Sequence, residues 1–260
     1  MKNTDLKSFY DKVYKKGEKK HYTKLLFKDA SLPLDEKEVL HSANWKGKTV
    51  LDVGCGTGLM ASLIGKAGAK KVLGLDFSPE AILKAKEAYS LPNLEFQAEN
   101  FEKHKDTYYI IVSLGTLEHM DNPFEALQRM KKLLKPKGKI ILTCPNWTNP
   151  RGYILQTLRL LWNAPITLAD IHYLTPVEFQ KWSKKLQMKL EWRTFDHDWG
   201  SGKKLIKDFE RRLPNVLRDI GITGKEKEIK EFIKWTEEHV LPFPDKTPEG
   251  GAVGLYILSK

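Results

Sequence analysis

The segment from Val50 to Gly58 constrains this chain more than any other part of it. It is an apolar run that ends in an acid and continues as three glycines at alternate positions, Gly54, Gly56 and Gly58. A helix-like pattern opens directly afterwards, at Leu59. Glycines at this spacing let the backbone turn sharply, and they let a ligand lie against the main chain where a Cβ would block it. The segment therefore predicts a strand, a ligand-binding turn and a helix.

Two acids near this turn indicate what kind of ligand it binds. Asp76 ends the next apolar run, 18 residues after Gly58, and an acid in that place can hold the two hydroxyls of a ribose. Asp52 lies two residues before the first glycine, where it would repel a pyrophosphate but would suit an ammonium group. Gly58 is followed by Leu59 and Met60 rather than by the Lys-Ser/Thr of a phosphate-binding loop. The pattern favours an adenosine-containing ligand without phosphate.

The composition is that of an ordinary globular protein. With 260 residues, 41% of them apolar and 30% charged, the chain can form one domain with insertions. Two cysteines give no disulfide framework, and the segment Met1 to Asp11 lacks the apolar stretch of a signal peptide, so we expect a cytoplasmic location. The net charge of +11 would suit RNA or a membrane surface. Because the lysines are interspersed with glutamates, a solvated basic surface is the preferred interpretation.

Strand-like and helix-like segments alternate from Thr49 onwards. The patterns predict strands at Thr49–Val53, Lys71–Asp76, Leu94–Ala98, Tyr108–Leu114 and Lys139–Thr143. They predict helices at Leu59–Ala67, Pro79–Tyr89 and Pro123–Leu134. Ser78 is a favourable N-cap before Pro79. Alternation at this spacing indicates an α/β fold with a doubly wound, parallel sheet.

The regular alternation stops after Pro145. Residues 46–145 are predicted to form a ligand-binding core, preceded by a helical segment (1–45, helical from Leu6 to about Leu40). Residues 146–174 and 200–249 are predicted to be helical cap insertions for a substrate, while 175–199 and 250–260 complete the sheet. The expected elements are an apolar stripe of Ile154, Leu155, Leu158, Leu161 and Trp162, helices at Pro176–Leu186, Lys203–Arg212 and Lys225–His239, and strands at Leu190–Phe195 and Ala252–Leu258.

From Val50 to Asn146 the chain resembles the class I S-adenosylmethionine-dependent methyltransferases. The glycine turn with Asp52 and Asp76 is similar to their first motif, and Leu117-Glu118-His119 is similar to a segment of the group that acts on small molecules, including the ubiquinone-biosynthesis enzymes. The resemblance implies a Rossmann-like, seven-stranded mixed sheet with helices on both faces and a helical cap. It implies S-adenosylmethionine as cofactor and a small-molecule acceptor.

The same resemblance assigns a set of cofactor-binding residues. In the family, an acid after the third strand meets the adenine amine, and Glu99 stands there in place of the more typical Asp. The backbone of Leu114 and Gly115 would flank the methionine part of the cofactor. The complete set is Asp52, Gly54, Cys55, Gly56, Thr57, Gly58, Asp76, Phe77, Glu99, Asn100, Phe101, Leu114 and Gly115.

Catalysis and acceptor binding are assigned to fewer residues. His119 would act as general base for a hydroxyl or an amine, or would only cap or pack a helix end. Some relatives bind a metal through an acid at the position of Gly115, so no metal is expected here. The segment from Asp170 to Pro176 resembles one that follows the fifth strand in the small-molecule group. The acceptor is expected to meet Asn146, Trp147, His172 and Tyr173.

The sequence leaves the acceptor open. Transfer to oxygen or nitrogen of a small molecule is the preferred hypothesis. The alternatives are an RNA methyltransferase, favoured only by the charge, and a protein that binds S-adenosylmethionine without turnover. A peripheral membrane contact through Ile154–Trp162, near Arg151 and Arg159, is a further alternative. The oligomeric state is not indicated.

Overall fold

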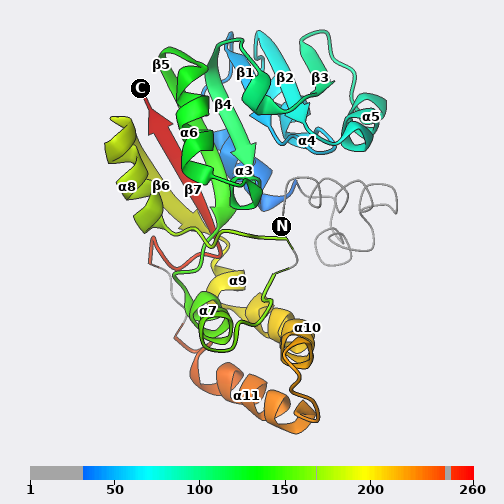
Figure 1. Cartoon of the computed structure of the whole chain (residues 1–260), viewed down its shortest axis with the longest axis vertical. Coiled ribbons are helices and arrows are strands. Elements are labelled where there is room, and N and C mark those ends of the chain that lie inside the picture. The colour runs from blue at the N-terminus through cyan, green and yellow to red at the C-terminus, as the bar shows by residue number, and fades with distance from the viewer. Residues whose placement is uncertain (1–31, 168, 244–246) are drawn as a thin grey trace. The chain divides into compact units, whose positions relative to one another are not determined.

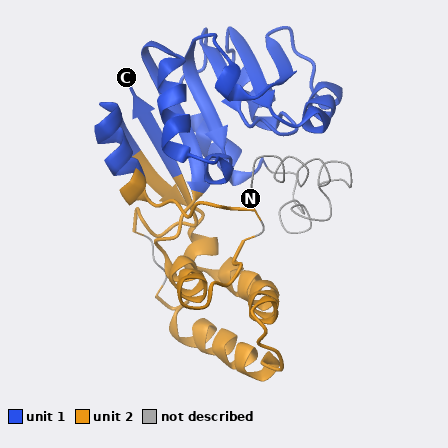
Figure 2. Ribbon diagram, viewed as in Figure 1, with its two compact units in different colours: residues 1–144, 179–191, 255–260 blue, residues 145–178, 192–254 orange. Residues whose placement is uncertain are grey.

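The computed structural model describes residues 32–167, 169–243 and 247–260, and it divides the chain into two compact units (Figure 2). Of the described residues, unit 1 contains 32–144, 179–191 and 255–260. Unit 2 contains residues 145–178 and 192–254, and therefore includes both predicted cap insertions. Among the described residues, none of the helices has the length and hydrophobicity needed to span a bilayer.

A seven-stranded sheet runs in the order β3-β2-β1-β4-β5-β7-β6 (Figure 1). Strands β1 to β5 pair in parallel, and the order reverses between β1 and β4, which makes this the topological switch point. The α/β class and the seven-stranded sheet are therefore confirmed. The strands are β1 Thr49–Val53, β2 Lys71–Asp76, β3 Leu94–Ala98, β4 Tyr108–Leu114, β5 Leu134–Pro145, β6 Lys189–Phe195 and β7 Val253–Ser259.

Two helices of the sheet region, α5 and α6, begin at short polar residues that cap them. Ser78 Oγ accepts a hydrogen bond from the backbone amide of Ala81 at 3.3 Å, and Asn122 Oδ1 accepts one from Glu125 at 3.2 Å. In both cases a proline follows the cap, as predicted for Ser78. The helices are α3 Leu34–His41, α4 Leu59–Lys66, α5 Pro79–Ala88, α6 Pro123–Lys132 and α8 Pro176–Leu186, with 3-10 turns η2 Phe101–Lys103 and η3 Leu117–His119. The part of the predicted N-terminal helix before residue 32 lies outside the described residues.

Strand β5 begins five residues earlier than predicted. The chain enters the sheet directly after α6, because Leu134 pairs with Tyr108 and the backbone amide of Tyr108 donates to the carbonyl of Leu133 at 2.8 Å. A register shift then separates this pair from the regular pairing of Ile110 with Lys139. The apolar alternation that signals a strand begins only after that irregularity, so the pattern predicted only the later part of the strand.

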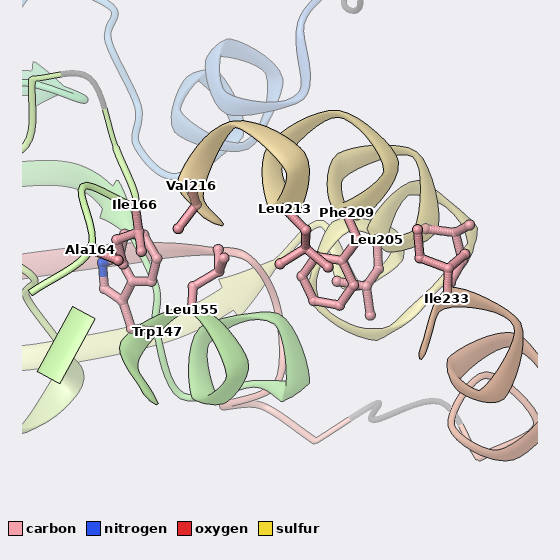
Figure 3. Packing of buried hydrophobic residues seen from close by; sticks show 10 residues of the cluster. Trp147, Leu155, Ala164, Ile166, Leu205, Phe209, Leu213, Val216 and Ile233 are labelled. Carbon is pink, nitrogen blue, oxygen red and sulfur yellow. The ribbon is translucent and has the colours of Figure 1, made fainter. Parts of the chain in front are cut away.

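Unit 2 has a hydrophobic core of its own (Figure 3). Its helices are α7 Pro150–Trp162, α9 His197–Ser201, α10 Lys203–Asp219 and α11 Glu226–His239. Helix α10 was predicted to end at about Arg212 but runs to Asp219, past Pro214, although proline removes a hydrogen bond from a helix interior. It continues because its apolar face, with Phe209 before the proline and Val216 after it, packs into this core.

The apolar stripe predicted on α7 is only partly buried. Leu155 is fully buried, and Ile154 and Leu158 pack against the core of unit 2. Leu161 and Trp162, the last two residues of the stripe, are 69% and 53% exposed. The apolar pattern of α7 therefore extends one turn beyond its buried face, and in that last turn the apolar side chains are exposed to solvent.

An ion pair between buried side chains links helix α7 to helix α10 within unit 2. The carboxylate of Asp208 is completely buried, and it accepts hydrogen bonds from Arg151 Nε at 2.9 Å and Arg212 Nε at 3.0 Å. The Arg151 guanidinium also lies over the Trp147 ring, 5.5 Å from its centroid. Burial lowers the pKa of Arg151, and the Asp208 charge opposes this change. One acid therefore compensates two buried cations.

Candidate active site

Unit 1 contains a cavity of about 910 Å³ beyond the carboxyl ends of β1, β2 and β3. We call it the strand-end cavity. Its wall includes residues from those strand ends, from η2 and η3 and from one side of α6, among them Gly54, Asp76, Glu99, Phe101, His119 and Arg129. Open α/β sheets bind ligands in this place, where the strand order reverses. The volume lies within the roughly 300–1,000 Å³ that is usual for ligand pockets.

The glycine turn adopts a backbone that few other residues could adopt. The φ angles of Gly54, Gly56 and Gly58 are 73°, 53° and 87°. A Cβ on Gly58 would lie 2.5 Å from the Phe96 ring, and one on Gly54 would lie 2.5 Å from the side chain of Thr116. The glycines therefore let the turn pack closely against its neighbours, and Gly54 forms part of the cavity wall.

Asp76 connects the glycine turn to the start of α5. Its Oδ2 accepts a hydrogen bond from the Gly56 amide at 3.0 Å, and its Oδ1 accepts one from the Ser78 amide at 2.9 Å. The side chain is buried and lines the strand-end cavity. Carboxylate oxygens accept more than one hydrogen bond each, so this rigidly held group can also accept from a pair of hydroxyls.

The end of β3 brings a second acid to the same wall. The backbone amide of Glu99 donates to the carbonyl of Asp76 at 3.0 Å, so the two acids lie next to each other at the ends of adjacent strands. Asn100 Oδ1 caps the η2 turn by accepting from the Glu102 amide at 3.0 Å. Glu99, Asn100 and the buried Phe101 all line the cavity. This wall offers acceptors for polar donors beside an aromatic surface.

Asp52 lies behind the glycine turn. It is 2% exposed, does not belong to the described cavity wall, and its Oδ2 has no hydrogen-bond partner among the described residues. Burial raises its pKa to about 7, assisted by the charges of Asp76 and Glu36, while a hydrogen bond from the Ala61 amide opposes this rise. A cation bound nearby would favour the ionised form of Asp52.

His119 reaches the cavity from the turn that follows β4. Gly115 has a φ of 56°, and its amide donates to the carbonyl of Thr143 at 3.0 Å. The amide of His119 donates to the Thr116 carbonyl at 3.1 Å, and the neighbouring Leu117 is fully buried. These interactions anchor η3 and place His119 in the wall of the same cavity as Asp76.

The strand-end cavity brings together much of the predicted set. The predicted residues that line it are Gly54, Asp76, Phe77, Glu99, Asn100, Phe101 and His119, whereas Asp52, Cys55, Gly56, Thr57, Gly58, Leu114 and Gly115 do not belong to its described wall. Helix α6 also contributes to the wall through Asn122, Glu125 and Arg129, which the sequence patterns did not predict. Asn122 before Pro123 was a visible helix-start signal, but it does not reveal which cavity that helix borders.

Two of the four predicted acceptor residues have structural roles in unit 2. The side-chain amide of Asn146 is buried and donates to the carbonyls of Glu249 and Gly251, both at 2.7 Å. Trp147 is buried in the core of unit 2, with its ring edge-on to Tyr173 at 5.2 Å. These contacts occupy side chains that were expected to face an acceptor. His172 and Tyr173 are half-buried, and their role toward an acceptor stays a prediction.

Comparison with known proteins identifies the family. Residues 26–194 match a family model described as a methyltransferase domain. The chain belongs to this methyltransferase family. The methyltransferase uses S-adenosylmethionine, as the glycine turn and the two strand-end acids indicate.

Curated relatives and solved structures agree with this assignment. The ubiquinone biosynthesis O-methyltransferase of Nitrosococcus oceani is 30% identical over 61% of this chain and 71% of its own length. That of Aliivibrio fischeri (strain ATCC 700601 / ES114) is 34% identical, but the match covers only 47% of this chain and 54% of the relative. An S-adenosylmethionine dependent methyltransferase from Mesorhizobium loti has the same fold, with a TM-score of 0.56, 14% identity, and coverage of 87% of this chain and 98% of that chain.

The strand-end cavity fits this cofactor. Asp76 would hold the ribose hydroxyls with its carboxylate, and Glu99 would accept from the amino group of adenine; both side chains line the cavity. Phe77 and Phe101 provide apolar surface beside them. No phosphate-binding lysine is needed, and the buried charge of Asp52 is of the sign that favours a cationic ligand. The chemistry of the wall thus agrees with the family.

Proposed function

We propose that this methyltransferase transfers its methyl group to an oxygen atom of a small organic molecule, with His119 as general base. The observation that supports the proposal most directly is the presence of His119 in the same cavity wall as Asp76 and Glu99. Curated relatives are O-methyltransferases of ubiquinone biosynthesis, which favours a hydroxyl acceptor and suggests a phenol as the first compound to test.

The proposed mechanism assigns limited tasks to the protein. The cofactor, when bound, supplies a methyl group that is already strongly electrophilic. Asp76 and Glu99 hold the nucleoside so that the acceptor can be aligned with that methyl group, and alignment supplies much of the rate. His119 accepts the proton of the acceptor hydroxyl on a ring nitrogen, which leaves the oxygen more nucleophilic.

The test compares His119→Ala with His239→Ala, a substitution of an exposed histidine on α11. Both variants should bind S-adenosylhomocysteine as the wild type does. With a phenolic acceptor, His119→Ala should lower kcat by roughly 10²–10⁴-fold, and His239→Ala should not change it. An unchanged kcat in His119→Ala would refute the role of this histidine as a base.

The choice of acceptors in the same assay decides between the remaining hypotheses. Phenols, primary amines and bulk RNA are each offered with labelled S-adenosylmethionine. Transfer to phenols supports the proposal, whereas transfer only to amines or only to RNA would replace it. Cofactor binding without transfer to any of a broad metabolite extract would favour the non-catalytic alternative.

We also propose that α7 rests on an anionic membrane surface. Tyr153, Leu160, Leu161 and Trp162 on this helix are 53–69% exposed, the helix contains no acid, and the chain has a net charge of +11. An amphipathic helix of this composition suits the interface of a lipid bilayer. Such a contact is compatible with the predicted cytoplasmic location.

Flotation with vesicles that contain anionic lipid tests this contact. The double variant Leu160→Ser and Trp162→Ser should lose vesicle binding. Phe243→Ser serves as the control, because it removes a residue that is 81% exposed but lies outside α7. Equal flotation of the double variant and the wild type would refute the proposal.

A further inference from the structure

A buried chain of hydrogen bonds stands behind Glu99. His104 is 6% exposed, and its Nδ1 lies 3.1 Å from Glu99 Oε2 while its Nε2 lies 2.8 Å from Tyr108 Oη. The backbone carbonyl of His104 accepts a hydrogen bond from the guanidinium of Arg129. His104 is therefore held at three points, and both Glu99 and Arg129 belong to the wall of the strand-end cavity.

The chemistry of the two partners assigns the protons on this histidine. An ionised carboxylate only accepts hydrogen bonds, so Nδ1 of His104 donates to Glu99. Burial raises the pKa of Tyr108 to about 12, assisted by the charges of Asp106, Glu95 and Glu99. Tyr108 therefore keeps its proton at neutral pH, and its hydroxyl can donate to an Nε2 that carries no proton. One tautomer satisfies both ends of the chain.

This arrangement matters because Glu99 has one more rotatable bond than the Asp that is typical of the family. A glutamate on a loop would otherwise distribute among several rotamers, and ordering it on ligand binding would reduce affinity. The hydrogen bond from His104 engages one carboxylate oxygen, Oε2. The same carboxylate then has a defined orientation in the cavity wall before a ligand arrives.

We propose that His104, oriented by Tyr108, is a positioning residue that aims Glu99 at the amino group of adenine and thereby selects adenine over a base with a carbonyl at that place. The inference depends on S-adenosylmethionine as cofactor and is independent of the acceptor. It predicts that base discrimination, and not only affinity or stability, depends on a histidine that does not itself belong to the described cavity wall.

Two conservative substitutions separate the two hydrogen bonds of His104. In His104→Asn the side-chain amide nitrogen falls near the position of Nδ1, so it can still donate to Glu99. In His104→Gln the amide falls near the position of Nε2, so it can reach Tyr108 but not Glu99. The two variants have similar polarity, and a general structural role would not distinguish them.

The measurement is the ratio of two dissociation constants, determined calorimetrically on the full chain. One ligand is S-adenosylhomocysteine, and the other is S-inosylhomocysteine, in which a carbonyl replaces the adenine amino group. A hydrogen bond to a charged group corresponds to roughly tenfold to hundredfold in affinity, so the wild type should prefer the adenosine form by at least about tenfold. His104→Asn should retain most of this preference, whereas His104→Gln and Glu99→Ala should lose it.

Each of the other possible results of this measurement would refute a different part of the proposal. If His104→Gln keeps the full preference, the positioning role is overturned. If His104→Gln does not fold, Tyr108→Phe decides, because it keeps the ring and removes the hydroxyl: a reduced preference supports the proposal and an unchanged one overturns it. Equal binding of both ligands by the wild type overturns the role of Glu99. Failure of the wild type to bind S-adenosylhomocysteine would instead contradict the cofactor assignment.

Discussion

Asp52→Asn should make the protein more stable at neutral and alkaline pH. Asp52 is an acid in the sheet interior with a carboxylate oxygen that finds no hydrogen-bond partner among the described residues. Its pKa is raised from 3.8 to about 7, chiefly by burial. Asn has nearly the same shape and can still accept the hydrogen bond from the Ala61 amide, but it has no charge to desolvate.

The sign and the magnitude follow from linkage between protonation and folding. Between about pH 4 and pH 7 the folded state keeps a proton on Asp52 that the unfolded state has lost, so stability falls as pH rises through this range and levels off above about pH 7. The difference between 3.8 and about 7, at roughly 1.4 kcal/mol for each pKa unit, sets an upper limit of about 4–5 kcal/mol. Between pH 5 and pH 8 the expected loss is about 2–3 kcal/mol.

Urea unfolding at a series of pH values measures this effect. The free energy of unfolding of the wild type should fall by about 2–3 kcal/mol more than that of Asp52→Asn between pH 5 and pH 8. Glu87→Gln, which removes an exposed acid on α5, is the matched control and should follow the wild type. If the wild type and Asp52→Asn show parallel pH dependence, Asp52 is ionised without cost in the folded protein and the reasoning fails.

Two further substitutions test the packing of the two units. Asp208→Asn leaves Arg151 and Arg212 buried without their counter-charge. This variant should be less stable than the wild type by roughly 3–5 kcal/mol, as measured by chemical unfolding. A loss of stability below about 1 kcal/mol would mean that water compensates these arginines. Gly58→Ala combines a left-handed backbone with a Cβ placed 2.5 Å from Phe96, so it should lower both the melting temperature and the affinity for S-adenosylhomocysteine. Gly221→Ala is its control, since that glycine also has a positive φ but has open space around it.

The core of the fold was predictable because its elements are specified locally. Caps such as Ser78, the alternation of apolar runs and the glycine turn mark the elements between residues 49 and 144 within one or two residues, except at the start of β5. The positions of Asp76, Glu99 and His119 at strand ends or just beyond them follow from the same alternation. Parallel strands then bring these positions to one edge of the sheet, so their common cavity is a consequence of topology.

The remaining features depend on contacts between distant residues, which local patterns do not show. Asn146 seemed available to an acceptor, but its amide binds carbonyls more than 100 residues later in the chain. Helix α10 passes Pro214 because the core of unit 2 stabilises its second half. The link from Glu99 through His104 to Tyr108 joins three residues with no recognisable spacing, and only the folded loop brings them together.

The central claim is that the strand-end cavity binds S-adenosylmethionine through Asp76. The most direct measurement is the stabilisation of the wild type and of Asp76→Ala by S-adenosylhomocysteine, with NAD and ATP as control ligands. At one hundred times the dissociation constant, S-adenosylhomocysteine should stabilise the wild type by about 2.7 kcal/mol, and Asp76→Ala, although folded, should lose most of this stabilisation at the same concentration. Full stabilisation of the variant, or greater stabilisation of the wild type by NAD or ATP, would contradict the account.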